Sequence, residues 1–204
     1  MDSQNELFEE AVVQCIAQLK DKNFLENREI LGAEVKGNSL VIPIYGQFYT
    51  ISAEGVKTQH GKTANPAVSV LLLKYVLNCP DKTPSEGEWV TYREFKGASV
   101  LSGHFIENTN KLIETSFSGK AERLHHAAIH MGGFPFDDGS SFDVAIEFEA
   151  LPRIPILLRF NDADGLFPAQ CSFLFRQSAE CFLDLKSLEV VGTLLASKLT
   201  GSNK

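Results

Sequence analysis

Residues 142–160 read FDVAIEFEALPRIPILLRF, and residues 169–175 read AQCSFLF. In these two stretches, apolar side chains occupy every second position of three consecutive runs, with mostly polar side chains between them. Successive side chains of a strand point to opposite faces of a sheet, so a period of two predicts antiparallel strands with one buried face. The predicted strands are 142–150, 154–160 and 169–175, and the even-numbered residues of the first two are expected to face the core.

The rest of the chain contains helical and strand patterns in separate blocks. Apolar positions at helical spacing predict helices at 7–19, 24–31, 65–77, 105–117, 121–131 and after Asp184, the third being the most buried. Short runs bounded by turn residues predict strands at 34–36, 40–45, 47–52, 56–58 and 89–95. Ser3 and Glu6 form a capping-box pattern, and Pro43 indicates an edge strand or a bulge because proline has no N–H for a ladder. Without regular βαβ alternation, the predicted class is α+β, with mainly antiparallel sheet packed by about five to six helices.

Length and composition narrow the class of protein. With 204 residues, 44% hydrophobic and 22% charged, the chain is predicted to form one globular domain, residues 1–204. The net charge of −7 argues against nucleic-acid and membrane partners, since both need clustered lysine and arginine. The four cysteines have no metal-ligand spacing, and neither a secretory signal nor a membrane-length apolar run is present, so a cytoplasmic protein is expected.

The helix predicted at 121–131 contains a possible set of metal ligands. Glu122, His126 and His130 lie at i, i+4 and i+8, and two histidines four residues apart can bind one divalent ion from a helix. Leu124 and Ala128 define the apolar face, and the histidines lie opposite it. We therefore expect solvated histidines, with no bound metal and no cofactor.

Other short motifs do not indicate catalysis. Residues 161–165, NDADG, resemble the start of a calcium loop, but the glycine comes too early and no glutamate closes the pattern. A polar hairpin turn is the preferred interpretation, because Asn, Asp and Gly supply turn dihedral angles. The sequence has no phosphate-binding glycine loop and no GxSxG nucleophile motif. An enzyme is therefore not the favoured interpretation.

Charged residues gather on the polar face of the three-stranded block, namely Glu147, Glu149, Arg153, Arg159 and Arg176. One interpretation is a solvated surface with cross-strand ion pairs. The other is a pocket in which Arg159 binds a carboxylate or phosphate through two parallel hydrogen bonds, with Arg93 joining from a neighbouring strand. The candidate ligand-binding residues are Arg93, Arg159 and Asp164, the last from the adjoining turn.

Four stretches resemble a known family: residues 87–95 (GEWVTYREF), 132–133 (GG), 150–155 (ALPRIP) and 162–169 (DADGLFPA). They resemble the prokaryotic family called domain of unknown function 3786, which is common in anaerobes and some of whose members carry an iron–sulfur cluster segment. The resemblance covers most of the chain and implies a bacterial or archaeal cytosolic protein. It brings no catalytic residues, and the scattered cysteines of this chain do not form a cluster site.

Together, the residues and the resemblance predict a cytoplasmic accessory module of anaerobic metabolism that binds a small anionic molecule. A protein–protein interaction module and an enzyme without a recognisable motif are the alternatives. A closed pocket lined by Arg159 and Arg93 would favour the ligand, whereas an exposed apolar patch would favour a protein partner.

Overall fold

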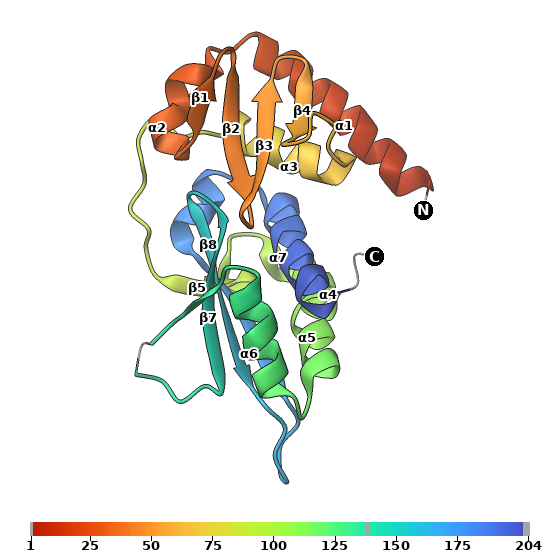
Figure 1. Cartoon of the computed structure of the whole chain (residues 1–204), viewed down its shortest axis with the longest axis vertical. Coiled ribbons are helices and arrows are strands. Elements are labelled where there is room, and N and C mark those ends of the chain that lie inside the picture. The colour runs from red at the N-terminus through yellow and green to blue at the C-terminus, as the bar shows by residue number, and fades with distance from the viewer. Residues whose placement is uncertain (1, 138, 202–204) are drawn as a thin grey trace.

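The computed structural model describes residues 2–137 and 139–201, with side chains from residue 6 onward. Two antiparallel sheets form its framework, one of four strands in the order β1-β2-β3-β4 and one of five in the order β5-β9-β8-β7-β6. Figure 1 shows the first sheet above the second, with α7 running between the helices of the two halves. The α+β class with mainly antiparallel sheet is therefore confirmed.

The first half of the chain builds the four-stranded sheet and the helices behind it (Figure 1). Its elements are α1 (Asp2–Lys20), the 3₁₀ turn η1 (Phe24–Asn27), α2 (Arg28–Leu31), β1 (Glu34–Lys36), β2 (Ser39–Ile44), β3 (Gln47–Ser52), β4 (Gly55–Thr58) and α3 (Pro66–Leu77). Asn65 caps α3, since its side-chain oxygen accepts a hydrogen bond from the Ala67 N–H at 2.9 Å. Every α3 residue from Ser69 to Leu77 except Lys74 is buried, so the prediction that this helix lies deep in the core is confirmed.

The second half of the chain builds the five-stranded sheet. Its elements are β5 (Trp89–Thr91), η2 (Tyr92–Glu94), η3 (Ala98–Val100), α4 (Ser102–Asn108), α5 (Asn110–Phe117), α6 (Ala121–His130), β6 (Phe134–Pro135), β7 (Val144–Leu151), β8 (Ile154–Asn161), β9 (Gln170–Arg176), η4 (Gln177–Cys181) and α7 (Leu185–Thr200). Asp184 caps α7, because its carboxylate accepts a hydrogen bond from the Ser187 N–H at 2.8 Å. Helices α4 to α7 cover one face of the sheet, which we call its inner face.

The predicted three-stranded block is confirmed as β7, β8 and β9, adjacent and antiparallel. Ile146 pairs with Leu158, and Leu158 with Phe173; all three side chains are buried on the inner face. The predicted alternation starts too early, however. Phe142 precedes β7, and its ring lies under the Arg159 guanidinium, 5.0 Å from the ring centroid, so Phe142 lies on the outer side of the sheet.

Hydrogen bonds of Tyr45 and Arg153 join the two halves of the chain, and one contiguous core of buried side chains includes residues of both sheets. At the β2–β3 turn, the Tyr45 N–H donates to the carbonyl oxygen of Ala150 at 3.0 Å, where a bulge interrupts the β7–β8 register. The Tyr45 hydroxyl donates to the carbonyl oxygen of Val191 in α7 at 2.8 Å. Beside the turn after β7, the Arg153 guanidinium donates to Ile30 and Glu29 carbonyl oxygens at 3.0 and 2.8 Å, at the end of α2.

Three local predictions need correction. The strand predicted at 89–95 ends at Thr91, because the Glu94 carboxylate accepts hydrogen bonds from the N–H and hydroxyl of Thr91 and closes a 3₁₀ turn. The helix predicted at 105–117 is broken at Thr109, whose hydroxyl donates to the Phe105 carbonyl oxygen. Strand β2 is an inner strand, but β1 ends opposite Val41, so Pro43 has a strand on one side only.

Two further features complete the fold. The side chain of Ser3 lies outside the described residues, and with it the predicted capping box. None of the helices in the described part of the chain combines the length and apolar character needed to cross a membrane.

Candidate functional site

The outer face of the five-stranded sheet, opposite α4 to α7, is partly covered. Leu157 and Leu174 point to this face and are buried. The Phe136 ring contacts the Trp89 ring edge-on, with centroids 5.9 Å apart, and the Arg176 guanidinium stacks on Trp89 at 4.2 Å. Arg159 likewise stacks on Phe142. Two of the three arginines predicted on this face are therefore packed against aromatic rings.

A cavity of about 480 Å³ opens where this covering stops. It lies between residues 83–86, the outer face of β7, the turn from Leu151 to Pro155, and η4. We call it the acidic cleft, because its charged lining residues are Glu86, Glu147, Glu149 and Arg153. Phe134 forms part of its wall and pairs with Glu147 across β6 and β7, so the ring and the carboxylate stand side by side.

The basic groups at the acidic cleft already have partners. Arg153 donates to the carbonyl oxygens of Ile30 and Glu29. Arg176, next to the cleft, donates to the Gly87 carbonyl oxygen at 3.2 Å, stacks on Trp89 and lies 3.5 Å from the Glu86 carboxylate. Among the residues that the structure describes, the cleft therefore offers no guanidinium that is free to bind an anion with its full set of donors.

The carboxylates of Glu147 and Glu149 differ from these arginines in their interactions with other side chains. Neither has a hydrogen bond or ion pair to another side chain in the part of the chain that the structure describes. Burial raises the pKa of the half-buried Glu147, the negative charge of Glu86 raises it further, and the nearby Arg176 offsets part of this rise. A positive charge placed in the cleft would stabilise the ionised form of Glu147.

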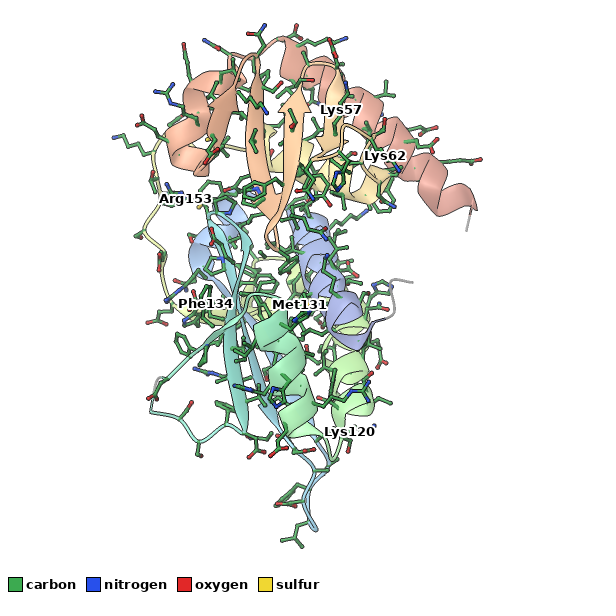
Figure 2. All side chains as sticks on the ribbon, in the orientation of Figure 1. Lys57, Lys62, Lys120, Met131, Phe134 and Arg153 are labelled. Atoms are coloured by element: carbon green, nitrogen blue, oxygen red, sulfur yellow. The ribbon has the colours of Figure 1, made fainter. Side chains whose placement is uncertain are left out.

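A second, smaller cavity of about 250 Å³ adjoins the cleft. Its walls are the β2–β3 turn with Pro43, Tyr45 and Phe48, the end of α6 with Met131, and Phe134 and Phe148 of the second sheet. We call it the apolar hollow, since Glu149 is its one charged lining residue. Figure 2 shows Phe134 and Met131 below the β2–β3 turn, with Arg153 closer to the first sheet.

The structure separates the three residues predicted to bind a ligand, and none of them lines either cavity. Arg93 is exposed in η2, beyond the end of β5. Arg159 lies on the outer face of β8, opposite Ala145 and Ser172. Asp164 is exposed in the β8–β9 turn, where its carboxylate accepts hydrogen bonds from the Leu166 and Phe167 N–H groups, both at 2.7 Å.

The calcium-like stretch 161–165 is a turn, as predicted, and one of its carboxylates supports a helix. The Asp162 side chain accepts hydrogen bonds from the Gly119 and Ala121 N–H groups at 2.5 and 2.9 Å, at the start of α6. Partial burial raises the pKa of Asp162, but these and neighbouring N–H groups outweigh it, so the net shift is downward. Asp162 therefore caps α6 from another strand connection.

The histidine stripe of α6 lies on the surface. Glu122, His126 and His130 are all exposed. Among the described residues, no three His, Cys, Asp or Glu side chains are grouped so that they could hold a metal ion. That the protein binds no metal stays a prediction.

Comparison with known proteins places this chain in a family. A family model described as a domain of unknown function, DUF3786, matches residues 23–198. The chain belongs to the DUF3786 family. No curated protein and no solved structure matches it.

Two residues of this DUF3786 chain that line the acidic cleft were not found by reasoning from sequence. Phe134 belongs to a two-residue strand, too short to show a period, and Glu86 lies in a loop. The nearest signals were the Gly132-Gly133 pair just before Phe134 and the resemblance beginning at Gly87. A Cβ at position 133 would lie 2.5 Å from Ile146 and 2.8 Å from Phe148. Because glycine has no Cβ, this connection packs directly against β7.

Proposed function

We propose that this protein is a binding module whose acidic cleft recognises a cationic group, an ammonium or a guanidinium. The observation that carries the proposal is Glu147, a half-buried carboxylate with no side-chain hydrogen bond or ion pair among the described residues. It lies beside the exposed ring of Phe134, in a cleft that also contains Glu149. Carboxylates bind such cations through charge-assisted hydrogen bonds, and an aromatic face adds cation–π attraction.

The proposed ligand is positively charged, whereas the ligand expected from the sequence is negatively charged. The anionic ligand depended on Arg159 and Arg93, which lie outside the cleft. Arg153 is the guanidinium within the cleft, and it is directed at backbone carbonyl oxygens. An anion would also lie against the Glu147 and Glu149 carboxylates, and like charges at close range are unfavourable.

Butylamine and methylguanidine, compared with succinate and inorganic phosphate, test the proposal. Each compound is titrated into ¹⁵N-labelled protein, and binding is followed by amide chemical shifts around β6 and β7. We expect the two cations to bind and the two anions not to bind. Glu147→Gln and Glu149→Gln should each weaken butylamine at least about tenfold, the equivalent of about 1.4 kcal/mol.

Glu34→Gln is the matched control for these variants. Glu34 is also a carboxylate on the outer face of a sheet, in β1, and it is exposed. The Glu34→Gln variant should bind butylamine with the affinity of the wild type. Saturable shifts with succinate or phosphate, and none with either cation, would contradict the cation proposal and support the anionic ligand.

We also propose that the module acts in the cytoplasm of a bacterial cell. Supporting this location, Cys15, Cys79, Cys171 and Cys181 are all free thiols. Unpaired cysteines are typical of reducing compartments. Periplasmic or extracellular recovery of the endogenous protein in cell fractionation would contradict it.

A further inference from the structure

We infer that the cation bound by the acidic cleft is carried by a segment of a partner protein, in which a large apolar residue stands within about three residues of a lysine or arginine. This inference rests on the proposed function and extends its site to the apolar hollow. The structural reason is that the two cavities are neighbours, one with an acidic lining and the other with an apolar lining.

The two cavities share walls. Phe134 and Glu149 line both of them, so the acidic cleft and the apolar hollow meet along one edge of the second sheet. An extended chain rises about 3.3 Å per residue. A short segment that crosses this shared wall therefore places one side chain in each cavity.

The apolar hollow has the features of an anchor site. Phe48 and Phe134 are 48% and 64% exposed, and they are among the few large hydrophobic side chains with such exposure. They come from different sheets but line the same hollow. Exposed apolar residues that gather around a concavity are typical of interaction sites, and large buried anchors supply most of the binding energy at such sites.

The hollow is also held in shape before anything binds. Tyr45, one of its walls, has a positive φ of 47°, which is uncommon for a bulky residue. Its N–H is bonded to Ala150 and its hydroxyl to Val191, so the turn is fixed to both β7 and α7. A preformed site avoids part of the entropy cost of ordering on binding.

On its β6 side, β7 has no strand partner beyond Glu147 in the described part of the chain. Strand β6 covers β7 as far as Glu147, which pairs with Phe134, and the β2–β3 turn covers it at Ala150. Glu149 lies between these two contacts and lines both cavities. An extended partner segment that follows the shared wall would pass this point, in the way that peptides add to exposed sheet edges.

Charge decides what kind of partner fits. Glu147 and Glu149 favour a basic residue, and the chain itself carries a net charge of −7, so most acidic partners are disfavoured. Among the exposed apolar groups that a second copy of this chain offers is the β8–β9 turn, with Leu166 and Phe167 86% and 64% exposed. We call this pair of side chains the β8–β9 knob. Asp164 is next to this knob and would bring a carboxylate toward Glu149, which argues against self-association.

A set of short peptides tests the inference. Six acetylated and amidated glycine-based peptides carry one phenylalanine placed one, two or three residues before or after one lysine. Matched peptides have alanine in place of phenylalanine, or glutamine in place of lysine. With butylamine as the bare cation, we expect at least one Phe–Lys peptide to bind about tenfold or more tightly than its alanine partner, and the glutamine peptides to bind more weakly than either.

Phe48→Ala separates the two cavities, because Phe48 lines the apolar hollow and not the acidic cleft. This variant should reduce the affinity of the best Phe–Lys peptide to that of its alanine partner and leave butylamine affinity unchanged. Phe167→Ala is the control, an exposed aromatic residue of the β8–β9 turn that lines neither cavity, and should change neither affinity.

Two outcomes would overturn the inference, and they differ in what they say about the proposed function. If butylamine binds but no phenylalanine peptide exceeds its alanine partner, the apolar hollow takes no part and the ligand is a free cation. If neither butylamine nor any lysine peptide binds, the proposed function fails and the inference fails with it.

Discussion

In the sheet β1–β4 the outer face is open to solvent, whereas in the sheet β5–β9 the outer face is buried over part of its length. Val41 and Thr50 on the outer face of the first sheet are half-buried. On the corresponding face of the second, Leu157 and Leu174 are buried. The cleft lies where the covering of the second sheet ends. Partial covering lowers the solvation of Glu147, whereas an open face would leave such a carboxylate fully hydrated.

The comparison predicts that equivalent outer-face truncations have unequal costs. Leu157→Ala should destabilise the protein by about 2–5 kcal/mol, as cavity-forming core substitutions do. Thr50→Ala, on the outer face of β3, should cost less than about 0.5 kcal/mol. Urea denaturation followed by fluorescence of Trp89 measures both. Similar costs for the two variants would contradict the claim that the second sheet is covered on both faces.

Replacing a glycine by a residue with a side chain should also reduce stability for different reasons at the two sheets. Gly133→Val should cost about 1–3 kcal/mol, because its side chain would enter the space of Ile146 and Phe148. Gly37, in the β1–β2 turn, has a positive φ of 59° but no atom near its Cβ position. Gly37→Ala should therefore cost only the backbone strain of about 1–2 kcal/mol.

A second substitution, Ile146→Ala, separates the two causes by thermal denaturation. Combined with Gly133→Val, it removes the Ile146 Cγ2 atom that would lie 2.5 Å from a Cβ at position 133, so the combined loss should be smaller than the sum of the two single losses. No such recovery is expected when Ile146→Ala is combined with Gly37→Ala. Equal recovery in both pairs would rule out direct crowding at Gly133.

Arg153 joins the second sheet to α2 and gives a prediction with two readouts. Arg153→Met keeps the side-chain stem but removes hydrogen bonds to Ile30 and Glu29, so the protein should lose about 1–2 kcal/mol of stability. Because the variant also makes the acidic cleft more negative, butylamine should bind more tightly to it. Arg28→Met, at an exposed site in α2, is the control and should change neither value appreciably.

An anion bound in the acidic cleft would respond to the same variant in the opposite way. Arg153 is the guanidinium that lines the cleft, so Arg153→Met would weaken such an anion. Weaker butylamine binding by Arg153→Met at unchanged fold, as judged by circular dichroism, would contradict the charge assignment of the cleft.

A small stability effect is expected at Glu147. Its pKa is raised in the folded protein, so its contribution to stability is fully present below the unfolded-state pKa and is lost as the pH rises through the folded-state pKa. Glu147→Gln removes this loss, and stability should fall less between about pH 4 and pH 7 in the variant than in the wild type. We expect a melting temperature at pH 7 that is higher by less than about 4 °C. Glu34→Gln should follow the wild-type pH profile.

The strands with regular apolar spacing and the starts of two helices were predictable, because these signals lie in neighbouring residues of the sequence. Period-two runs gave β7 to β9, and Asn65-Pro66 and Asp184 marked the starts of α3 and α7. One available signal was not used: Ile156-Leu157-Leu158 breaks the alternation, which indicates a strand covered on both faces. Phe142, by contrast, fits the alternation but belongs to the covering loop.

The candidate site was only half predictable. Glu147, Glu149 and Arg153 were placed on one polar face, where they lie. The sequence gives no means to pair Arg153 with carbonyl groups more than 120 residues earlier, or Phe134 with Glu147 through a two-residue strand. Reasoning from the sequence treated the arginines as available and therefore favoured an anion. In the structure, long-range contacts give Arg153 and Arg176 backbone partners and leave the cleft carboxylates available, and for this reason we propose a cation.

The most direct test of the account is the ionisation of Glu147 itself, measured by carboxyl ¹³C NMR as a function of pH with and without butylamine. The Glu147 signal is assigned with Glu147→Gln, and Glu34 serves as the internal reference. The account predicts a pKa above the usual glutamate range in the free protein and a lower pKa with butylamine, since a bound cation stabilises the carboxylate. A Glu147 pKa that stays the same as butylamine is added would contradict it.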